Sequence, residues 1–219
     1  MTKKILAIIF FGVIFLSVAV CLTIGIVYGV SSGQNGQGEM EGLGMFKAFT
    51  IDSNVLAALI SLVAVIYLVS HNGMEIPNWL HTLLLASATS LMITFVTVVV
   101  FLVPVRIANG IPWVSMYSDD MYFYHLLNPI LSVVGLILTG PKKFSIGARF
   151  CAVIPVFVYS IVYGICVIII KCWSDFYGFT FGGRYYYVPL VMLIMYAGGF
   201  LFASLLSLAT GRKAKTNKD

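Results

Sequence analysis

Six long apolar segments dominate the sequence and restrict the folds that are open to it. They cover about residues 5–30, 51–70, 80–104, 122–139, 148–170 and 188–209. A helix needs about 20 apolar residues to cross a bilayer, and each segment comes close to or exceeds that length. With 60% hydrophobic and 10% charged residues and a mean hydropathy of +1.01, the chain is too apolar for a soluble globular domain. The sequence therefore predicts an all-α, polytopic membrane protein, a single transmembrane domain of about six helices over residues 1–219.

The distribution of positive charge predicts the orientation of the chain. Of the 13 Lys and Arg residues, nine fall on the side that holds both termini. The other four are Lys47, Arg106, Lys171 and Arg184. Because positive loops stay in the cytoplasm, both the N- and C-termini are expected there. The stretch 31–44, rich in Gly and Gln, is then a flexible external loop, and 210–219 is a basic cytoplasmic tail.

The first group of polar residues lies where the second apolar segment begins. It consists of Thr50, Asp52, Ser53 and Asn54. Polar side chains within a membrane span are costly and often functional. Capping of the helix explains one of the hydroxyl groups, but Asn54 lies deeper and shares a helical face with Thr50.

The second group lies near the start of the fourth segment. His125 and Asn128 are three residues apart and share a helical face, and Pro129 cannot donate to the carbonyl of His125. A kink is therefore expected at the histidine. Thr50 and His125 each lie about 17–20 residues from the cytoplasmic end of their span, roughly 25–30 Å at 1.5 Å per residue. Both are expected at the same level of the outer leaflet.

A stripe of hydroxyl residues follows one face of the third segment. Its members recur three and four residues apart and are Ser87, Ser90, Thr94 and Thr97. Small hydroxyl residues favour close packing between membrane helices, and the alternative interpretation is the wall of a polar cavity, to which Arg106 would also belong.

Thr50 and His125 together suggest a reaction. A threonine hydroxyl is a weak nucleophile until a base removes its proton, and histidine is the usual base because its pKa lies near neutrality. Asn54 or Asn128 could orient the imidazole or stabilise an oxyanion. No His/Cys spacing that would hold zinc is present, and no phosphate-binding loop, so neither a metal nor a cofactor is expected.

Two short motifs resemble a known family. The segments 47–54 (KAFTIDSN) and 125–129 (HLLNP) look like those of the androgen-induced and androgen-dependent TFPI-regulating protein family and its bacterial six-helix relatives. Animal members of this family are intramembrane threonine hydrolases that cleave fatty-acid esters of hydroxy fatty acids. The resemblance implies that Thr50 is the nucleophile and His125 the base. It also implies a bacterial cell membrane as the location, because the match is closer to the bacterial members.

Three functions follow from these features. The first is a lipid-ester hydrolase or acyltransferase that takes a membrane lipid or acyl ester as its substrate. The second is a membrane-embedded subunit for binding or transport of a small molecule, in which the third-segment hydroxyls and Arg106 line the ligand site. The third is a non-catalytic scaffold. A nucleic-acid partner is not expected, because the charges sit in loops and tails, and the oligomeric state stays open.

Overall fold

The protein is all-helical wherever its structure is described. The structure, a computed structural model, describes residues 2–28, 42–140 and 143–211, and no strand occurs among them. In chain order the helices are α1 (Thr2–Tyr28), η2 (Gly42–Lys47), α2 (Phe49–Ser70), α3 (Asn78–Thr97), η3 (Val98–Leu102), α4 (Val103–Ala108), η4 (Trp113–Tyr117), α5 (Asp120–Tyr122), η5 (Phe123–Leu127), α6 (Asn128–Leu138), α7 (Ile146–Cys151), α8 (Ile154–Gly164), η6 (Ile165–Ile169), η7 (Tyr185–Tyr187) and α9 (Val188–Gly211).

The six predicted helices are confirmed as helices that are long and apolar enough to cross a membrane. They run over Thr2–Val27, Phe49–Ser70, Asn78–Ala108, Asp120–Leu138, Ile146–Ile169 and Tyr185–Gly211. Large apolar side chains such as Leu16, Ile66 and Leu193 are exposed on their outer faces. A broad apolar surface of this kind suits contact with lipid rather than with water.

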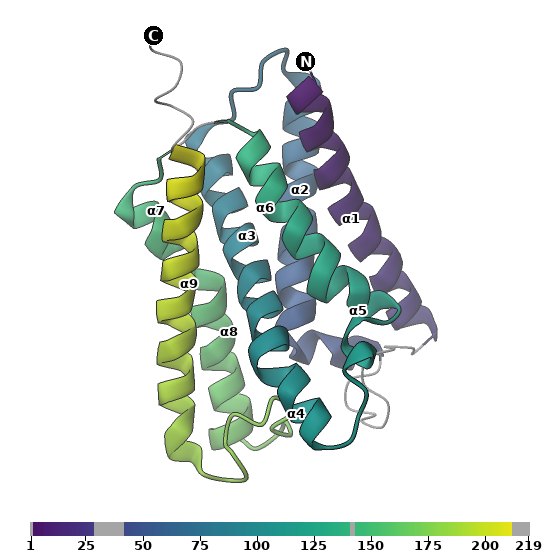
Figure 1. Cartoon of the computed structure of the whole chain (residues 1–219), viewed down its shortest axis with the longest axis vertical. Helices are drawn as coiled ribbons and strands as arrows, with labels where there is room; N and C mark the ends of the chain where they lie inside the picture. Colours follow the sequence, from purple (N-terminus) through teal and green to yellow (C-terminus); the bar gives the residue numbers. More distant parts are fainter. Residues whose placement is uncertain (1, 29–41, 141–142, 212–219) are drawn as a thin grey trace.

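Helix α3 forms the centre of the bundle. It packs against α2, α6 and α9, while α1 lies against α2 and α6 (Figure 1). Leu80, Leu84 and Leu91 of α3 are buried in the cluster that these helices share. The central position explains why α3 is the helix on which small hydroxyl residues recur, because they let its neighbours approach closely.

Prolines interrupt three of the six spans. Proline has no N–H group, and its ring collides with the carbonyl four residues earlier. Pro104 follows η3 and Pro129 follows η5, and both η3 and η5 are π-helical turns. The kink predicted at His125 thus takes the form of a π turn, in which the N–H of Asn128 donates to the carbonyl five residues earlier. Pro155 divides the fifth span into α7 and α8, although the sequence predicted one helix.

The π turns gather at one end of the bundle. A third one, η6, closes the fifth span without a proline after it. The first turn of α2, α4, η4 and η5 lie at this same end, at the bottom of Figure 1. We call it the pocket end, because the cavity that Thr50 and His125 line, which we call the main cavity, opens there.

The segments between and after the spans agree only in part with the sequence prediction. Residues 42–44, predicted as the end of a flexible loop, begin the short helix η2, whose Met45 is buried. The remainder of that predicted loop, 31–41, lies outside the described residues. Of the predicted basic tail, Thr210 and Gly211 still belong to α9, and 212–219 lie outside the description.

Gly135 marks a close approach between α6 and α1. A Cβ atom added at Gly135 would lie 2.7 Å from the ring of Phe11, which is fully buried. Gly135→Ala is therefore expected to lower the free energy of unfolding by about 1–3 kcal/mol, because the ring cannot move without displacing α1. Thermal unfolding in detergent measures this effect. Gly12→Ala is the matched control, since open space surrounds that position, and an equal loss of stability in both variants would contradict the prediction.

Candidate functional site

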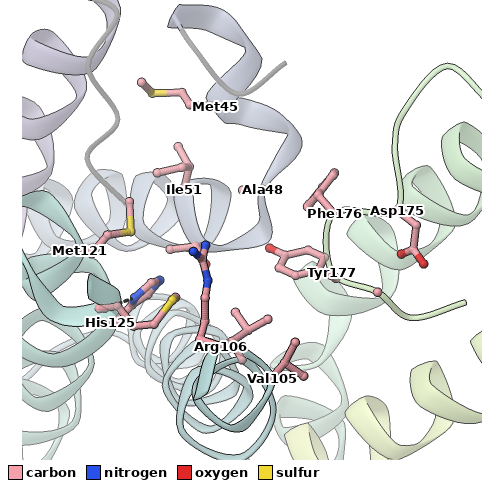
Figure 2. A pocket seen from close by; sticks show the side chains of 14 residues that line it. Met45, Ala48, Ile51, Val105, Arg106, Met121, His125, Asp175, Phe176 and Tyr177 are labelled. Atoms are coloured by element: carbon pink, nitrogen blue, oxygen red, sulfur yellow. Dashed lines mark hydrogen bonds between the residues drawn. The ribbon is translucent and has the colours of Figure 1, made fainter. Parts of the chain in front are cut away.

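A cavity of about 220 Å³ opens at the pocket end. The segment 170–184, which we call the strap, forms one wall of this cavity. The other walls are η2, the first turn of α2, the end of α4 and the η4–η5 region. Figure 2 shows Arg106 between His125 on one side and Tyr177 on the other. The lining residues are Met45, Ala48, Thr50, Ile51, Leu102, Val105, Arg106, Met116, Met121, His125, Asp175, Phe176, Tyr177 and Gly178.

The polar partner of His125 in the described part of the chain is a backbone carbonyl. Its Nδ1 lies 2.7 Å from the carbonyl oxygen of Met116 in η4, and its ring packs edge-on against Tyr117. Because a carbonyl only accepts hydrogen bonds, Nδ1 carries the proton, and Nε2 of the neutral ring keeps its lone pair. The side chain is only 2% exposed, which excludes bulk water from the ring. The imidazole is therefore oriented as a proton acceptor through Nε2.

Thr50 lies in the first turn of α2, where backbone N–H groups lack helical partners. The residue before the helix, Ala48, gives no side-chain cap. The strap fills that role, because the hydroxyl of Tyr177 forms hydrogen bonds with the backbone of Phe49 and Thr50 and with the side chain of Thr50. A helix N-terminus left without a cap attracts a polar oxygen in this way.

Tyr177 belongs to a chain of hydrogen bonds. The hydroxyl of Tyr159 donates to the carbonyl of Lys47 at 2.6 Å and also bonds with Tyr177. Since the one proton of Tyr159 goes to Lys47, Tyr177 donates in the bond between the two tyrosines. Burial raises the pKa of Tyr177 to about 12, even though the bonds from Thr50 and Phe49 act in the opposite direction. The phenol therefore keeps its proton at neutral pH.

Asp175 fixes the shape of the strap. Its carboxylate accepts hydrogen bonds from the backbone N–H groups of Phe179 and Thr180, from the hydroxyl of Thr180 and from Tyr163 of α8. Burial raises the pKa of Asp175, but these hydrogen bonds outweigh it and hold the pKa below the ordinary value of 3.8. The charged form of Asp175 is thus the one that stabilises the strap.

The strap is expected to loosen in acid. Because the pKa of Asp175 is lowered in the folded protein, its contribution is present above pH 3.8 and is lost as the pH falls through the folded value. Trp173, which packs against Phe176 in the strap, reports this change by its fluorescence when Trp79 and Trp113 are replaced by Phe. Asp175→Asn should show no transition in this range, and the same acid transition in that variant would contradict the assignment.

Asn54 and Asn128 bind each other rather than the imidazole of His125. Nδ2 of Asn128 donates to Oδ1 of Asn54 at 2.9 Å, and Oδ1 of Asn128 accepts from Ser17 of α1. Nδ2 of Asn54 donates to the carbonyl of Thr50 at 2.8 Å and to that of Tyr124 at 3.3 Å. The two asparagines thereby join α1, α2 and α6 immediately behind the pocket.

The other polar residues predicted from the sequence take part mainly in packing. Ser53 bonds Thr94 at 3.0 Å, and Ser87 lies 3.5 Å from Ser132 of α6. Ser90 is fully buried, and its hydroxyl has no partner among the described residues. These contacts favour the packing interpretation for this part of the hydroxyl stripe.

Several of the predicted residues line cavities besides Thr50 and His125. Arg106 lines the main cavity, as the alternative interpretation proposed for it. Thr97 lines a small cavity that adjoins the main one. Asp52 lines a separate lateral groove between α2 and α8.

Thr50 and His125 share the pocket without bonding to each other. The hydroxyl of Thr50 faces Tyr177 and the Nδ1 of His125 faces Met116, and no hydrogen bond between Thr50 and His125 occurs in the described structure. Sequence reasoning missed Tyr177 and Asp175. The available signal was the density of aromatic residues in the strap, which is too high for a loop in water.

Comparisons with known proteins identify no relative. No protein-family model, no curated protein and no solved structure matches the chain. Among the described residues, no group of three or more His, Cys, Asp or Glu side chains could hold a metal ion. The function is therefore inferred from the residues of the pocket.

Proposed function

We propose that this protein is a membrane-embedded lipid-ester hydrolase or acyl-transfer enzyme with Thr50 as nucleophile and His125 as general base. The observation that carries the proposal is the shared pocket, in which Thr50 and His125, whose Nδ1 is engaged by Met116, line one cavity from two different spans. The resemblance of segments 47–54 and 125–129 to intramembrane threonine hydrolases supports the same pair of residues.

The reaction follows the pattern of other hydroxyl nucleophiles. Substrate binding turns the Thr50 hydroxyl from Tyr177 to Nε2 of His125, which takes the proton as Oγ1 attacks the ester carbonyl carbon. His125 then gives this proton to the departing alcohol. A water, or a second alcohol in acyl transfer, attacks the acyl-threonine and restores the hydroxyl.

The first turn of α2 can stabilise the negative charge that develops. The backbone N–H groups of Phe49 and Thr50 point at the hydroxyl oxygen of Tyr177. A carbonyl oxygen that takes the place of that hydroxyl meets the same two donors. Arg106, on the opposite wall, adds a positive charge to the cavity.

Three adjoining cavities support an acyl chain as the substrate. A small cavity shares Thr50, Leu102 and Tyr177 with the main pocket. The small cavity also shares Thr97, Phe179 and Met195 with a groove of about 340 Å³ between α3–η3 and α9.

The groove is suited to hydrocarbon. It is lined almost wholly by apolar side chains, and two of them, Val100 and Ile194, are exposed on the outer surface of the bundle. A lipid tail can enter there from the bilayer and place its ester at Thr50.

The proposed location is a bacterial cell membrane, crossed six times, with both termini in the cytoplasm. The excess of Lys and Arg on the side of the termini supports this orientation. The pocket end then faces the outer leaflet, so the enzyme meets lipids of that leaflet.

Covalent labelling tests the proposal. A lipophilic fluorophosphonate is expected to label the purified protein at Thr50, as identified by peptide mass spectrometry, because an activated hydroxyl attacks phosphorus as it attacks an ester. Thr50→Ala and His125→Gln should lose the label while melting at the same temperature as the wild type. Ser53→Ala is the matched control, since its hydroxyl faces Thr94. A folded wild type that takes no label would instead favour capture of a ligand without chemistry.

A further inference from the structure

Two of the four cysteines lie together where the strap leaves η6. The backbone N–H of Cys172 donates to the carbonyl of Cys166 at 2.9 Å, and the two side chains are also hydrogen bonded. Lys171 between them has a left-handed φ of 56°, which turns the chain back over the end of the helix. Both sulfurs are free thiols in the structure.

We propose that Cys166 and Cys172 form a disulfide that fastens the strap to the end of the fifth span. The backbone hydrogen bond and the contact between the two thiols already place Cys166 and Cys172 side by side at the end of the helix. A disulfide only has to bring the two touching sulfurs to about 2 Å, so the bond requires little movement of the backbone. Cys172 is exposed and Cys166 is partly exposed, which gives an oxidant access to the pair.

The chemistry is a thiol–disulfide exchange. The thiolate of Cys172 attacks the disulfide of an oxidising thiol oxidoreductase, and the resulting mixed disulfide is resolved by Cys166. One Sγ–Sγ bond forms, the two cysteines lose two protons and two electrons, and the oxidoreductase is reduced to its dithiol. Such oxidants act outside the cytoplasm, so the inference rests on the proposed orientation of the pocket end.

The other two cysteines do not offer a competing pair in the described structure. Cys21 is buried in α1, where its thiol bonds with Tyr124, and Cys151 ends α7. Helix α7 lies near the opposite end of the bundle in Figure 1.

A bridge to Cys166 would hold Cys172, near the start of the strap, three residues before Asp175 and five before Tyr177. The strap would then be fixed by the disulfide at one end and by the Asp175 hydrogen bonds in its middle.

Tryptic mapping of the wild-type protein tests the bond, because Lys171 lies between the two cysteines. After free thiols are alkylated, trypsin cleaves at Arg149, Lys171 and Arg184 and separates 150–171 from 172–184. The expected result is one linked species, lighter than the two peptides by two hydrogens, that divides on reduction. Cys151→Ser should keep the link, whereas Cys166→Ser should lose it. Two alkylated, unlinked peptides from membranes of growing cells would overturn the proposal.

Labelling of intact cells tests the proposed orientation, on which this inference rests. In Cys166→Ser, the remaining Cys172 thiol should react with a membrane-impermeant sulfonated maleimide without prior reduction. Reaction only after the cells are permeabilised would place the pocket end in the cytoplasm and overturn both the orientation and the disulfide. Fluorophosphonate labelling of the same variant reports on catalysis independently, so loss of the bridge and loss of the Thr50 chemistry are distinguishable.

Discussion

Hydrolysis of a long-chain fluorogenic ester is expected to fall at least about 100-fold in Thr50→Ala and in His125→Gln. A positioned general base contributes roughly 10²–10⁴ to the rate, and removal of the nucleophile abolishes the covalent route altogether. His125→Gln keeps a hydrogen-bond donor for the carbonyl of Met116, so the η4–η5 contact is preserved while the proton acceptor is lost. Turnover by the purified protein in detergent or nanodiscs measures the effect.

Two comparisons make this result specific. Thr50→Ser retains a hydroxyl in the same place and should keep a measurable rate. The double variant Thr50→Ala/His125→Gln should be no slower than either single variant, because residues that act as one unit are not additive. Equal activity of the wild type and Thr50→Ala, with both folded, would rule out the proposed nucleophile.

Asn128→Leu is expected to cost about 1–3 kcal/mol of the free energy of unfolding. The substitution leaves Oδ1 of Asn54 without its donor from Asn128, whereas the Ser17 hydroxyl keeps its bond to the carbonyl of Ile14, and both asparagines are fully buried. An unpaired polar group in the interior carries its full desolvation cost. Unfolding of the protein in mixed detergent and denaturant measures the loss.

The paired variant distinguishes a lost bond from lost packing. Asn54→Leu/Asn128→Leu removes both partners of the amide pair, so its cost should be smaller than the two single costs added together. If the two costs simply add, the hydrogen bond between the asparagines contributes little. Because Asn54 also donates to the carbonyl of Thr50, the single variants should lower esterase activity as well.

The six long apolar helices were predictable because they depend on length and hydropathy alone. A span must bury about 20 consecutive residues in hydrocarbon. This requirement involves only residues that are neighbours in the sequence, so it can be recognised without knowing the fold. The expectation that Thr50 and His125 lie at one level followed from counting residues along helices. The break at Pro155 was missed because the helix was assigned from the length of the apolar segment. A proline inside a helix is a local signal that could have revealed it.

The strap could not be predicted by such counting. Its position depends on contacts between segments far apart in the sequence, such as those of Tyr177 with the first turn of α2 and of Asp175 with Tyr163. The roles of Asn54 and Asn128 were missed for a related reason. Helical spacing shows which side chains share a face, but it does not show which neighbouring helix that face meets.

The three π turns distinguish one end of the bundle from the other. Each of η3, η5 and η6 carries one residue more per turn than an α-helix, and all three lie at the pocket end. Such a surplus residue can be passed along a helix by exchanging one hydrogen bond at a time, which rotates the side chains beyond it without unfolding the span. The half of the bundle where α1 begins and α9 ends has no π turn among its described residues, so this means of adjustment belongs to the half that holds His125.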